Sequence, residues 1–206
     1  MVRLLFFVGL TSLAGPVAVK ANEQVDGASI IVTGTRDIYR AIDTTSGTKT
    51  RTPIIDVPQT IDVVTQRQMS DQAIRSMADL VRLIPGISAG QGEGHRDQIT
   101  LRGNNTTADF FVDGLRDDVQ YYRGFYNVDR VEVHKGANAM VFGRGGGGGV
   151  VNRITKGALV GQDVGAATAS VDSFGSSYGA VDLNGALGAA TAVRLNGFYE
   201  GLDSHR

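Results

Sequence analysis

Five consecutive glycines, Gly145 to Gly149, constrain this chain more than any other feature of its sequence. Glycine permits backbone conformations and close backbone contacts that a Cβ atom would forbid. The stretch also fits the spacing of a dinucleotide-binding fingerprint, which requires a helix directly after the glycines to bind phosphate. Here the segment from Val150 to Thr155 follows, rich in β-branched residues, and it predicts a strand. We therefore expect the glycines to serve turns and close strand contacts rather than a nucleotide site.

Composition excludes several classes of function. Of the 206 residues, 42% are hydrophobic and 20% charged, which is typical of a folded chain. The net charge of -1 and the scattered basic residues argue against nucleic-acid binding. The chain has no cysteine, which excludes disulfides and thiolate chemistry, and His95, His134 and His205 show no metal-ligand spacing. With 28 glycines, four prolines and no tryptophan, the composition favours turn-rich β structure.

Residues 1–21 have the pattern of a secretory signal peptide. Arg3 precedes an apolar run that ends near Ala14, and the small residue Ala21 provides a cleavage signal. The apolar run is too short to cross a bilayer as a helix. We expect an exported chain that begins near Asn22.

Residues 22–52 are predicted to form a flexible tether, because Thr, Ser, Gly and Asp dominate them. The tether contains one compact apolar stretch, Ile30 to Val32. Such a stretch can add as a strand to the sheet edge of another protein. It can equally form an edge strand of the domain that follows, and the residues alone leave both possibilities open.

Residues 53–157 are predicted to form a compact α+β domain. The segment "QTIDVVTQ" predicts a strand, and from Ser70 to Ile84 the apolar residues fall at helical spacing. Ser76 and Asp79 have the spacing of a capping box, so we expect two short helices here.

Further along, the pattern is that of β structure. "DQITLRG" alternates apolar and polar residues, Asp113-Gly114 predicts a hairpin turn, and "VDRVEVHKG" places Glu132 on the face opposite Val131 and Val133. The expected fold is a small mixed sheet with short helices.

Three ordered motifs carry a resemblance to a known family. They are "DVPQTIDVVTQRQMSDQAIRSMADLVRLIPGI", "ITLRG" and "FFVDGLRDDVQYYRGFYNVDRVEVHKGANAMVFGRGGGGGVVNRITK". In this order they resemble the plug domain of TonB-dependent outer-membrane receptors, and most of all the catecholate-type ferric-siderophore receptors. "SIIVTG" in the tether is similar to the TonB box of that family. The residues assigned to the box are Ser29, Ile30, Ile31, Val32, Thr33 and Gly34.

The resemblance implies a function, a location and partners. It implies energy-coupled uptake of a ferric siderophore across the outer membrane of a Gram-negative bacterium, with no enzymatic step. The plug would fill a lipid-embedded barrel, the N-terminus would lie in the periplasm, and the tether would bind the TonB C-terminal domain. The siderophore would hold the iron, so no protein cofactor is expected. The alternatives are a receptor for haem, cobalamin or a carbohydrate, and a soluble periplasmic plug-like binding module.

The resemblance also selects candidate site residues. Anionic ferric catecholates favour arginine and aromatic surfaces, and on this basis we predict siderophore contacts at Arg96, Tyr121, Tyr122 and Arg123. The alternative for the two tyrosines is that they pack in the plug core or against the barrel wall. Four other charged residues are predicted to form ion pairs between plug and barrel, because enclosed charges need partners. They are Arg102, Glu132, Lys135 and Arg144.

Residues 158–206 show the alternation of membrane barrel strands, with runs such as Val193, Leu195 and Tyr199 set against polar neighbours. Soluble hairpins show the same alternation. The family resemblance implies a 22-stranded barrel, whereas 49 residues follow Gly157. We therefore expect these residues to be the first barrel strands of a truncated receptor that is not transport-competent by itself.

Overall fold

The computed structural model describes residues 39–203 with the exception of 92, 93 and 144. The predicted signal peptide, the predicted TonB box and Arg144 lie outside the described residues. Among the described residues, no helix is long and apolar enough to cross a membrane.

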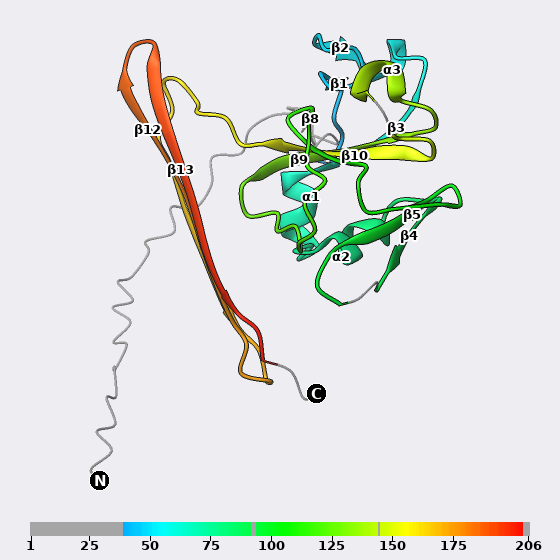
Figure 1. The fold of residues 1–206 in the computed structure, drawn as a ribbon. Helices are drawn as coiled ribbons and strands as arrows, with labels where there is room; N and C mark the ends of the chain where they lie inside the picture. Colours follow the sequence, from blue (N-terminus) through cyan, green and yellow to red (C-terminus); the bar gives the residue numbers. More distant parts are fainter. Residues whose placement is uncertain (1–38, 92–93, 144, 204–206) are drawn as a thin grey trace, which may run out of the picture. The chain divides into compact units, whose positions relative to one another are not determined.

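A five-stranded mixed sheet forms the centre of the domain (Figure 1). Its order is β3-β9-β10-β7-β8, in which β10 and β7 run parallel and the other neighbours antiparallel. The strands are β3 (Thr60–Thr65), β9 (Val128–Lys135), β10 (Gly149–Thr155), β7 (Phe110–Val112) and β8 (Leu115–Arg116). The predicted α+β class with a small mixed sheet is confirmed.

Strand β9 is buried on both faces. Val131 and Val133 face the main core, as the alternation predicts. Glu132 and His134 point to the other face, and both are also fully buried. The chain just before the sheet covers that face, since Thr44 is buried and bonds to Glu132. The carboxylate therefore lies between two layers of the protein rather than at its surface.

In the part of the chain that the structure describes, three short α-helices and one 3-10 helix accompany the sheet. They are α1 (Gln66–Asp71), α2 (Met77–Val81), α3 (Ala139–Phe142) and η1 (Ile54–Asp56). Ser76 and Asp79 form the predicted capping box at α2, with each side chain accepting from the other's backbone N–H. Helix α1 begins earlier than predicted, because Thr65 caps it directly at the end of β3. Ala73, at φ +52°, separates the first two helices.

A second sheet of three antiparallel strands supplies the other side of the core. Its strands are β4 (Ile87–Gly90), β5 (Gln98–Leu101) and β6 (Asn104–Thr106). Ile99 and Leu101 of β5 are fully buried, as the alternation in "DQITLRG" predicts. They pack in one cluster with residues from α2 and β9, including Leu80 and Val131.

The end of the glycine run lies against neighbouring backbone. A Cβ added to Gly148 would approach the Leu101 carbonyl oxygen to 2.2 Å, and one on Gly149 would approach the His134 carbonyl oxygen to 2.4 Å. Gly149 also has φ +146°, which side chains rarely adopt. Strand β10 begins at Gly149, and no helix follows the glycines. The glycines thus allow close strand contact, as predicted.

A separate three-stranded antiparallel sheet follows along the chain. It consists of β11 (Val164–Val171), β12 (Ser177–Gly188) and β13 (Thr191–Gly201). Leu183 and its cross-strand partner Leu195 lie on one face and are half or more exposed. Asp182 and Asn184 lie on the other face of β12 and are buried. The predicted alternation is present, with the apolar side chains on the exposed face.

The segment before the central sheet is ordered rather than a free tether from residue 39 onward. It forms the two-residue strands β1 (Asp43–Thr44) and β2 (Thr52–Pro53), which pair with each other. Ser46 accepts a hydrogen bond from the Asn152 amide of β10. Residues 39–52 therefore differ from the flexible tether that was predicted over residues 22–52. The physical reason is that buried polar side chains of the sheet take their hydrogen-bond partners from the hydroxyl groups of this segment.

Candidate functional site

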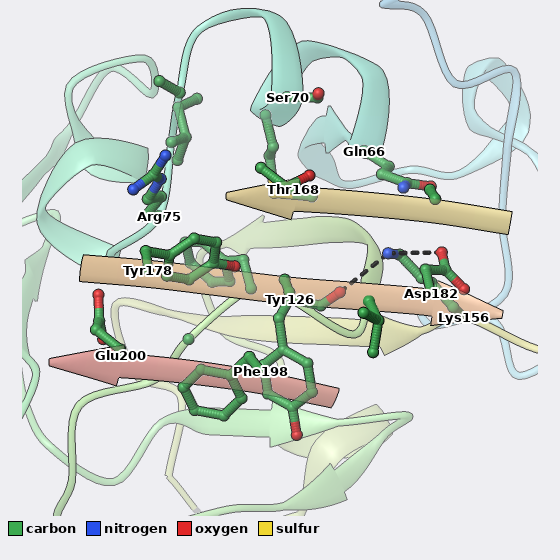
Figure 2. Close-up of a pocket in the computed structure, with 18 residues that line it drawn as sticks. Gln66, Ser70, Arg75, Tyr126, Lys156, Thr168, Tyr178, Asp182, Phe198 and Glu200 are labelled. Carbon is green, nitrogen blue, oxygen red and sulfur yellow. Dashed lines mark hydrogen bonds and ion pairs between the residues drawn. The ribbon is translucent and has the colours of Figure 1, made fainter. Parts of the chain in front are cut away.

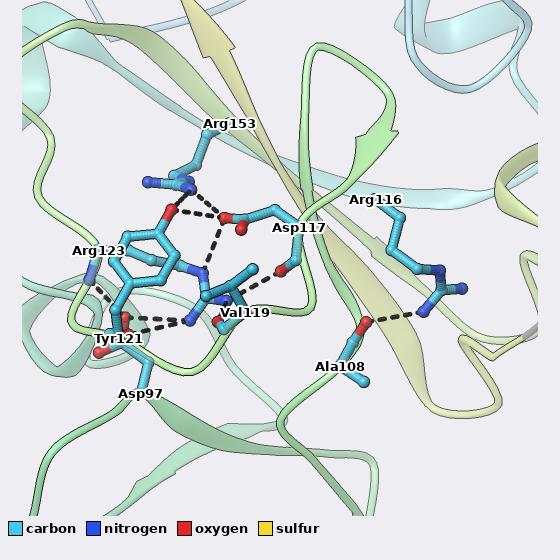
Figure 3. A network of polar contacts seen from close by, with 8 residues as sticks. All are labelled: Asp97, Ala108, Arg116, Asp117, Val119, Tyr121, Arg123 and Arg153. Carbon is cyan, nitrogen blue, oxygen red and sulfur yellow. Dashed lines mark hydrogen bonds and ion pairs between the residues drawn. The ribbon is translucent and has the colours of Figure 1, made fainter.

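The loop between β8 and β9 is organised by a buried arginine, Arg123 (Figure 3). Its guanidinium donates to the carbonyl oxygens of Asp117, Val119 and Tyr121 at 2.7–3.2 Å, and its Nε donates to the Asp117 carboxylate at 3.2 Å. The guanidinium also lies 4.0 Å from the ring centroid of Phe110. Only 1% of the Arg123 surface is exposed, and its side chain fixes the conformation of the loop. The sequence had instead predicted that Arg123 contacts the siderophore.

Asp117 is shared between this loop and the central sheet. Its Oδ2 accepts hydrogen bonds from the Tyr121 hydroxyl at 2.7 Å, from Arg123 and from Arg153 of β10. Arg153 also donates to the Tyr121 hydroxyl oxygen at 2.8 Å. Two arginines thus neutralise one largely enclosed carboxylate, which such a charge requires. Tyr121 is bonded to both residues, but its side chain is 37% exposed, so its contact with a siderophore stays a prediction.

Asp97, directly before β5, ties the same loop to the second sheet. Its carboxylate accepts a hydrogen bond from the Arg123 backbone N–H at 2.8 Å and lies 3.7 Å from the Arg123 guanidinium. Burial raises the pKa of Asp97, although the bonds and charge of Arg123 act in the opposite direction. Asp117 at the start of the loop and Asp97 outside it therefore both bond to Arg123.

A pocket of about 280 Å³ lies beside this network. Arg96 and Tyr122, two of the predicted siderophore contacts, both line it. Tyr122 is 60% exposed, in contrast to Arg123 of the same loop. The remaining lining residues come from α2, from β4 and β5, and from the segment between these two strands, and are Met77, Ala78, Ala89, Gly90, Gln91, Asp97 and Gln98.

The lining of the pocket suits an anionic, aromatic ligand. An arginine and an exposed aromatic ring at one hollow can hold an anionic, aromatic molecule by charge attraction, cation–π contact and stacking. Among the described residues, no group of three or more His, Asp or Glu side chains could hold a metal ion. The structure thus brings Arg96 and Tyr122 together and places Tyr121 and Arg123 in the scaffold that orients the loop.

Sequence reasoning missed the acidic half of this network. Asp97 and Asp117 stand in the motifs "DQITLRG" and "LRDDVQYYRG", close to the arginines selected as ligand contacts. Enclosed arginines require carboxylate partners, so the acidic residues of these motifs were the available signal. Arg153 gave no such signal, since it lies 36 residues after the carboxylate that it contacts.

A second buried cluster centres on Glu132 of β9. Thr44 donates its hydroxyl hydrogen to Oε2, and Arg130 donates to Oε1 at 2.9 Å. His134 Nε2 lies 3.5 Å from Oε2, at the limit of hydrogen bonding. Burial by itself would raise the pKa of Glu132, but the interactions with His134, Thr44, Arg130 and Ser46 together lower it from 4.5 to about 2. The carboxylate therefore stays ionised inside the domain.

The charged residues predicted to pair with a barrel differ from one another in their surroundings. Glu132 has its partners within the domain, which differs from the expectation, because both faces of β9 are covered. Lys135 forms an ion pair with Asp62 of the neighbouring strand β3. Arg102 is exposed in the turn after β5, with φ +47°. For Arg102 and for Arg144, pairing with a barrel stays a prediction.

Comparison with known proteins identifies the domain. Residues 53–150 match the TonB-dependent Receptor Plug Domain family. These residues are a TonB-dependent receptor plug domain. The matched residues include β3 to β9, the first two residues of β10 and the pocket. Thr44 and Ser46 of the Glu132 cluster and Arg153 of the Asp117 network lie outside the match.

Two curated relatives that match most of this chain are named as receptors. It is 35% identical over 184 residues to a probable TonB-dependent receptor, BfrD, of Bordetella pertussis, covering 88% of this chain and 24% of the relative. It is 29% identical over 194 residues to the catecholate siderophore receptor Fiu of Escherichia coli, covering 92% and 25%. The chain spans about a quarter of the length of these curated relatives.

A solved structure shows the same fold. The crystal structure of the siderophore receptor PiuA from Acinetobacter baumannii matches with a TM-score of 0.72 at 27% identity. The match covers 81% of this chain and 24% of that one. This coverage exceeds the 98 residues matched by the plug family alone, so the likeness extends beyond the plug.

Proposed function

We propose that this chain forms the plug-bearing N-terminal part of an outer-membrane receptor for energy-coupled uptake of a ferric siderophore. The observation that carries the proposal is the pairing of Arg96 and Tyr122 at one pocket of a TonB-dependent receptor plug. The names of two relatives, a catecholate siderophore receptor and a siderophore receptor, support this substrate class. The siderophore carries the iron, and the plug supplies no metal ligand and performs no reaction.

In this scheme the pocket recognises part of the siderophore. The Arg96 guanidinium attracts the negative charge of a ferric catecholate, and the Tyr122 ring stacks on a catechol ring. The buried network beneath keeps the loop in place, because the Arg123 guanidinium holds the Tyr121 carbonyl oxygen before Tyr122 and Asp97 holds the Arg123 backbone N–H after it. A preorganised loop loses less conformational entropy on binding.

A chimera tests the proposal. The chain replaces the matching quarter of Fiu, in an Escherichia coli host without its own catecholate receptors. The expected result is uptake of radioactive iron complexed by 2,3-dihydroxybenzoate. Arg96→Ala and Tyr122→Ala should each weaken apparent affinity about tenfold, the size of one desolvated cation–π or stacking contact. Arg82→Ala, at an exposed position that does not line the pocket, is the control.

Two outcomes would contradict the proposal. If the chimera reaches the outer membrane but takes up haem, cobalamin or a carbohydrate and no ferric catecholate, the substrate class is different. If the chain by itself is monomeric and folded without detergent and binds the ferric catecholate, the soluble binding module is the better description.

We also propose that residues 29–34 bind the periplasmic TonB C-terminal domain by adding a strand to its sheet, with the N-terminus of the mature chain in the periplasm. A peptide of residues 26–37, "DGASIIVTGTRD", should bind that domain. Ile31→Pro should abolish binding, because proline removes a backbone donor and restricts the strand. Thr35→Ala, outside the proposed box, should leave binding unchanged. Equal binding by all three peptides would refute pairing through these residues.

A further inference from the structure

A second hollow, of about 290 Å³, lies between the plug and the three-stranded sheet β11–β13 (Figure 2). Its plug side is formed by α1, by the segment between α1 and α2, and by residues 124–126 before β9. Its other side is a face of the sheet. The second hollow shares no lining residue with the pocket beside Tyr122, so the two are separate.

The register of the sheet explains why this face is hollowed. Ala180 of β12 pairs with Thr168 of β11, so two small side chains lie side by side. Ala166 of β11 follows on the same face, two residues away. In the other direction, the next pair on this face is Tyr178 with Ser170. A floor of small side chains beside a large one leaves a space that the two layers do not fill.

One end of the second hollow carries a cation, Arg75. Its guanidinium lies 4.5 Å from the ring centroid of Tyr178 and donates to the Ser170 hydroxyl oxygen at 2.9 Å. No carboxylate in the described part of the chain forms an ion pair with Arg75, and its side chain is accessible to solvent. A guanidinium has five N–H donors, so most of those of Arg75 are available to an anion.

The cation at the other end is already neutralised. Lys156 stands where the chain leaves the plug after β10, and it lies 3.0 Å from the Asp182 carboxylate. Arg194 of β13 binds the two oxygens of the same carboxylate at 2.8 and 2.7 Å. Lys156 also donates to the Tyr126 carbonyl oxygen, as Figure 2 shows. These charges have partners within the protein, which leaves Arg75 as the cation that attracts a ligand.

Aromatic rings line the second hollow between its two ends. The rings of Tyr126 and Phe198 stack with centroids 4.2 Å apart, and Phe198 is 49% exposed. Ring faces beside a guanidinium suit a ligand that is both aromatic and anionic. The volume lies at the lower end of the range of about 300–1,000 Å³ that is typical of ligand pockets. It therefore suits one aromatic ring rather than several rings arranged around a metal ion.

We propose that the second hollow is a binding site for a single-ring aromatic anion, such as a benzoate or a catechol acid. The ligand carboxylate pairs with Arg75, and its ring lies over Ala180 between Tyr178 and Phe198. This site differs from the pocket on which the proposed function depends, and it requires no iron uptake. The same chemistry is offered by a free acid and by one ring of a larger molecule.

Glu200 allows the sign of the ligand charge to be tested. It is the cross-strand partner of Tyr178, and Figure 2 shows it at the same end of the second hollow as Arg75. Its negative charge disfavours a bound anion, so Glu200→Gln should strengthen binding about two- to fivefold. Arg75→Gln should weaken binding at least about tenfold, since it removes the cation.

Calorimetry on the full chain in detergent, with iron-free 2,3-dihydroxybenzoate as the probe, measures these affinities. Every protein in the series carries Arg96→Ala, which suppresses binding at the pocket beside Tyr122. Ala180→Leu should abolish binding, because the larger side chain fills the floor of the second hollow. Ala169→Leu makes the same change on the opposite face of β11 and should leave the affinity unchanged. Circular dichroism verifies that each variant is folded.

Related probes identify the ligand class and its source. Benzoate should bind, whereas neutral catechol should bind at least about tenfold more weakly because it offers Arg75 no charge. If the ferric complex of 2,3-dihydroxybenzoate binds with the same dependence on Arg75, the site accepts one ring of a larger molecule. If only the iron-free acid binds, the site is specific for a free acid.

Two results would overturn the proposal. The first is the absence of saturable binding of the iron-free acid to the parent chain. The second is binding that Ala180→Leu leaves unchanged and that Glu200→Gln does not strengthen. The second result decides the question even if Arg75→Gln fails to fold. Binding that follows the expected pattern would establish the site even if the Fiu chimera imports no ferric siderophore, because calorimetry does not depend on transport.

Discussion

Thr44 donates its hydroxyl hydrogen to the Glu132 carboxylate, and this bond joins two fully buried residues that lie 88 positions apart. It connects the segment that precedes the plug to strand β9 of the plug. A hydrogen bond to an ionised, enclosed group is stronger than one between neutral groups. This bond is therefore a principal contact between the N-terminal segment and the plug.

Replacing Thr44 tests that contact. Thr44→Val keeps the shape of the side chain but leaves the carboxylate without one of its donors, and the expected cost is about 1.5–3 kcal/mol of stability. The change should appear as faster hydrogen exchange over residues 43–53, beyond the effect of Thr44→Ser, which retains the hydroxyl. Equal exchange in the two variants would show that the hydroxyl contributes nothing.

The depressed pKa of Glu132 predicts a pH dependence of stability. A carboxyl with a pKa of about 2 in the folded state and 4.5 when unfolded stabilises the fold above pH 4.5, and the stabilisation is lost as the pH falls toward 2. The difference corresponds to about 3 kcal/mol. In denaturant titrations followed by circular dichroism, Glu132→Gln should be less stable than the parent at pH 7, and the gap should close on acidification.

The exposed Asp118 provides the control for that experiment. Asp118→Asn should track the parent at every pH. His134 and Arg130 face the same carboxylate. The stability of Glu132→Gln is therefore compared with that of the parent at each pH, so that effects common to both proteins cancel. A gap that stays constant from pH 7 to pH 2 would contradict the prediction.

The glycine run predicts a contrast between adjacent positions. Gly148→Ala and Gly149→Ala place a Cβ against backbone oxygens and should each destabilise the plug by more than about 2 kcal/mol, the cost of a clash that the backbone must relieve. A Cβ on Gly147 meets nothing within 4 Å, so Gly147→Ala should change stability by less than about 1 kcal/mol. Thermal denaturation of the three variants decides this, and equal effects would refute it.

Arg123 is predicted to act through its shape as well as its charge. Lysine keeps the charge but cannot reproduce the fork that donates to Asp117, Val119 and Tyr121. Arg123→Lys should therefore lower stability by about 2–4 kcal/mol and disorder the loop around Tyr122, since buried acceptors are left unsatisfied. Arg51→Lys, at an exposed side chain, should have no such effect. Unchanged protection of the loop amides would contradict this role.

Local signals in the sequence predicted much of the fold. The alternation of β5, β9 and β13, the capping box at Ser76, and the hairpin at Asp113-Gly114 all depend on residues close together in the chain. At Asp113 and Gly114 the φ angles are +50° and +79°, as a two-residue hairpin turn requires. The start of α1 was missed because its cap, Thr65, is also the last residue of a strand.

The candidate site was only partly predictable. Arg96 and Tyr122 were selected for their chemistry, and the structure places both at one pocket. Arg123 was selected on the same grounds but is buried, where its partners are the carboxylate of Asp117 in the same loop and that of Asp97, 26 residues earlier. The sequence shows which types of side chain are present, whereas the structure shows whether a side chain is exposed and can contact a ligand.

The sequence by itself determined the order of strands and turns along the chain, the expectation that the glycine run allows turns and close strand contacts, and the resemblance to a receptor plug. The tertiary structure alone decided which charges became internal supports: Glu132 between β9 and the N-terminal segment, Arg123 under the loop, and Asp182 at the plug's exit. Hydrophobic alternation is set by neighbours along the chain. The partner of a buried charge comes from wherever the fold brings an opposite charge within about 3 Å, and that distance is a property of the packed molecule.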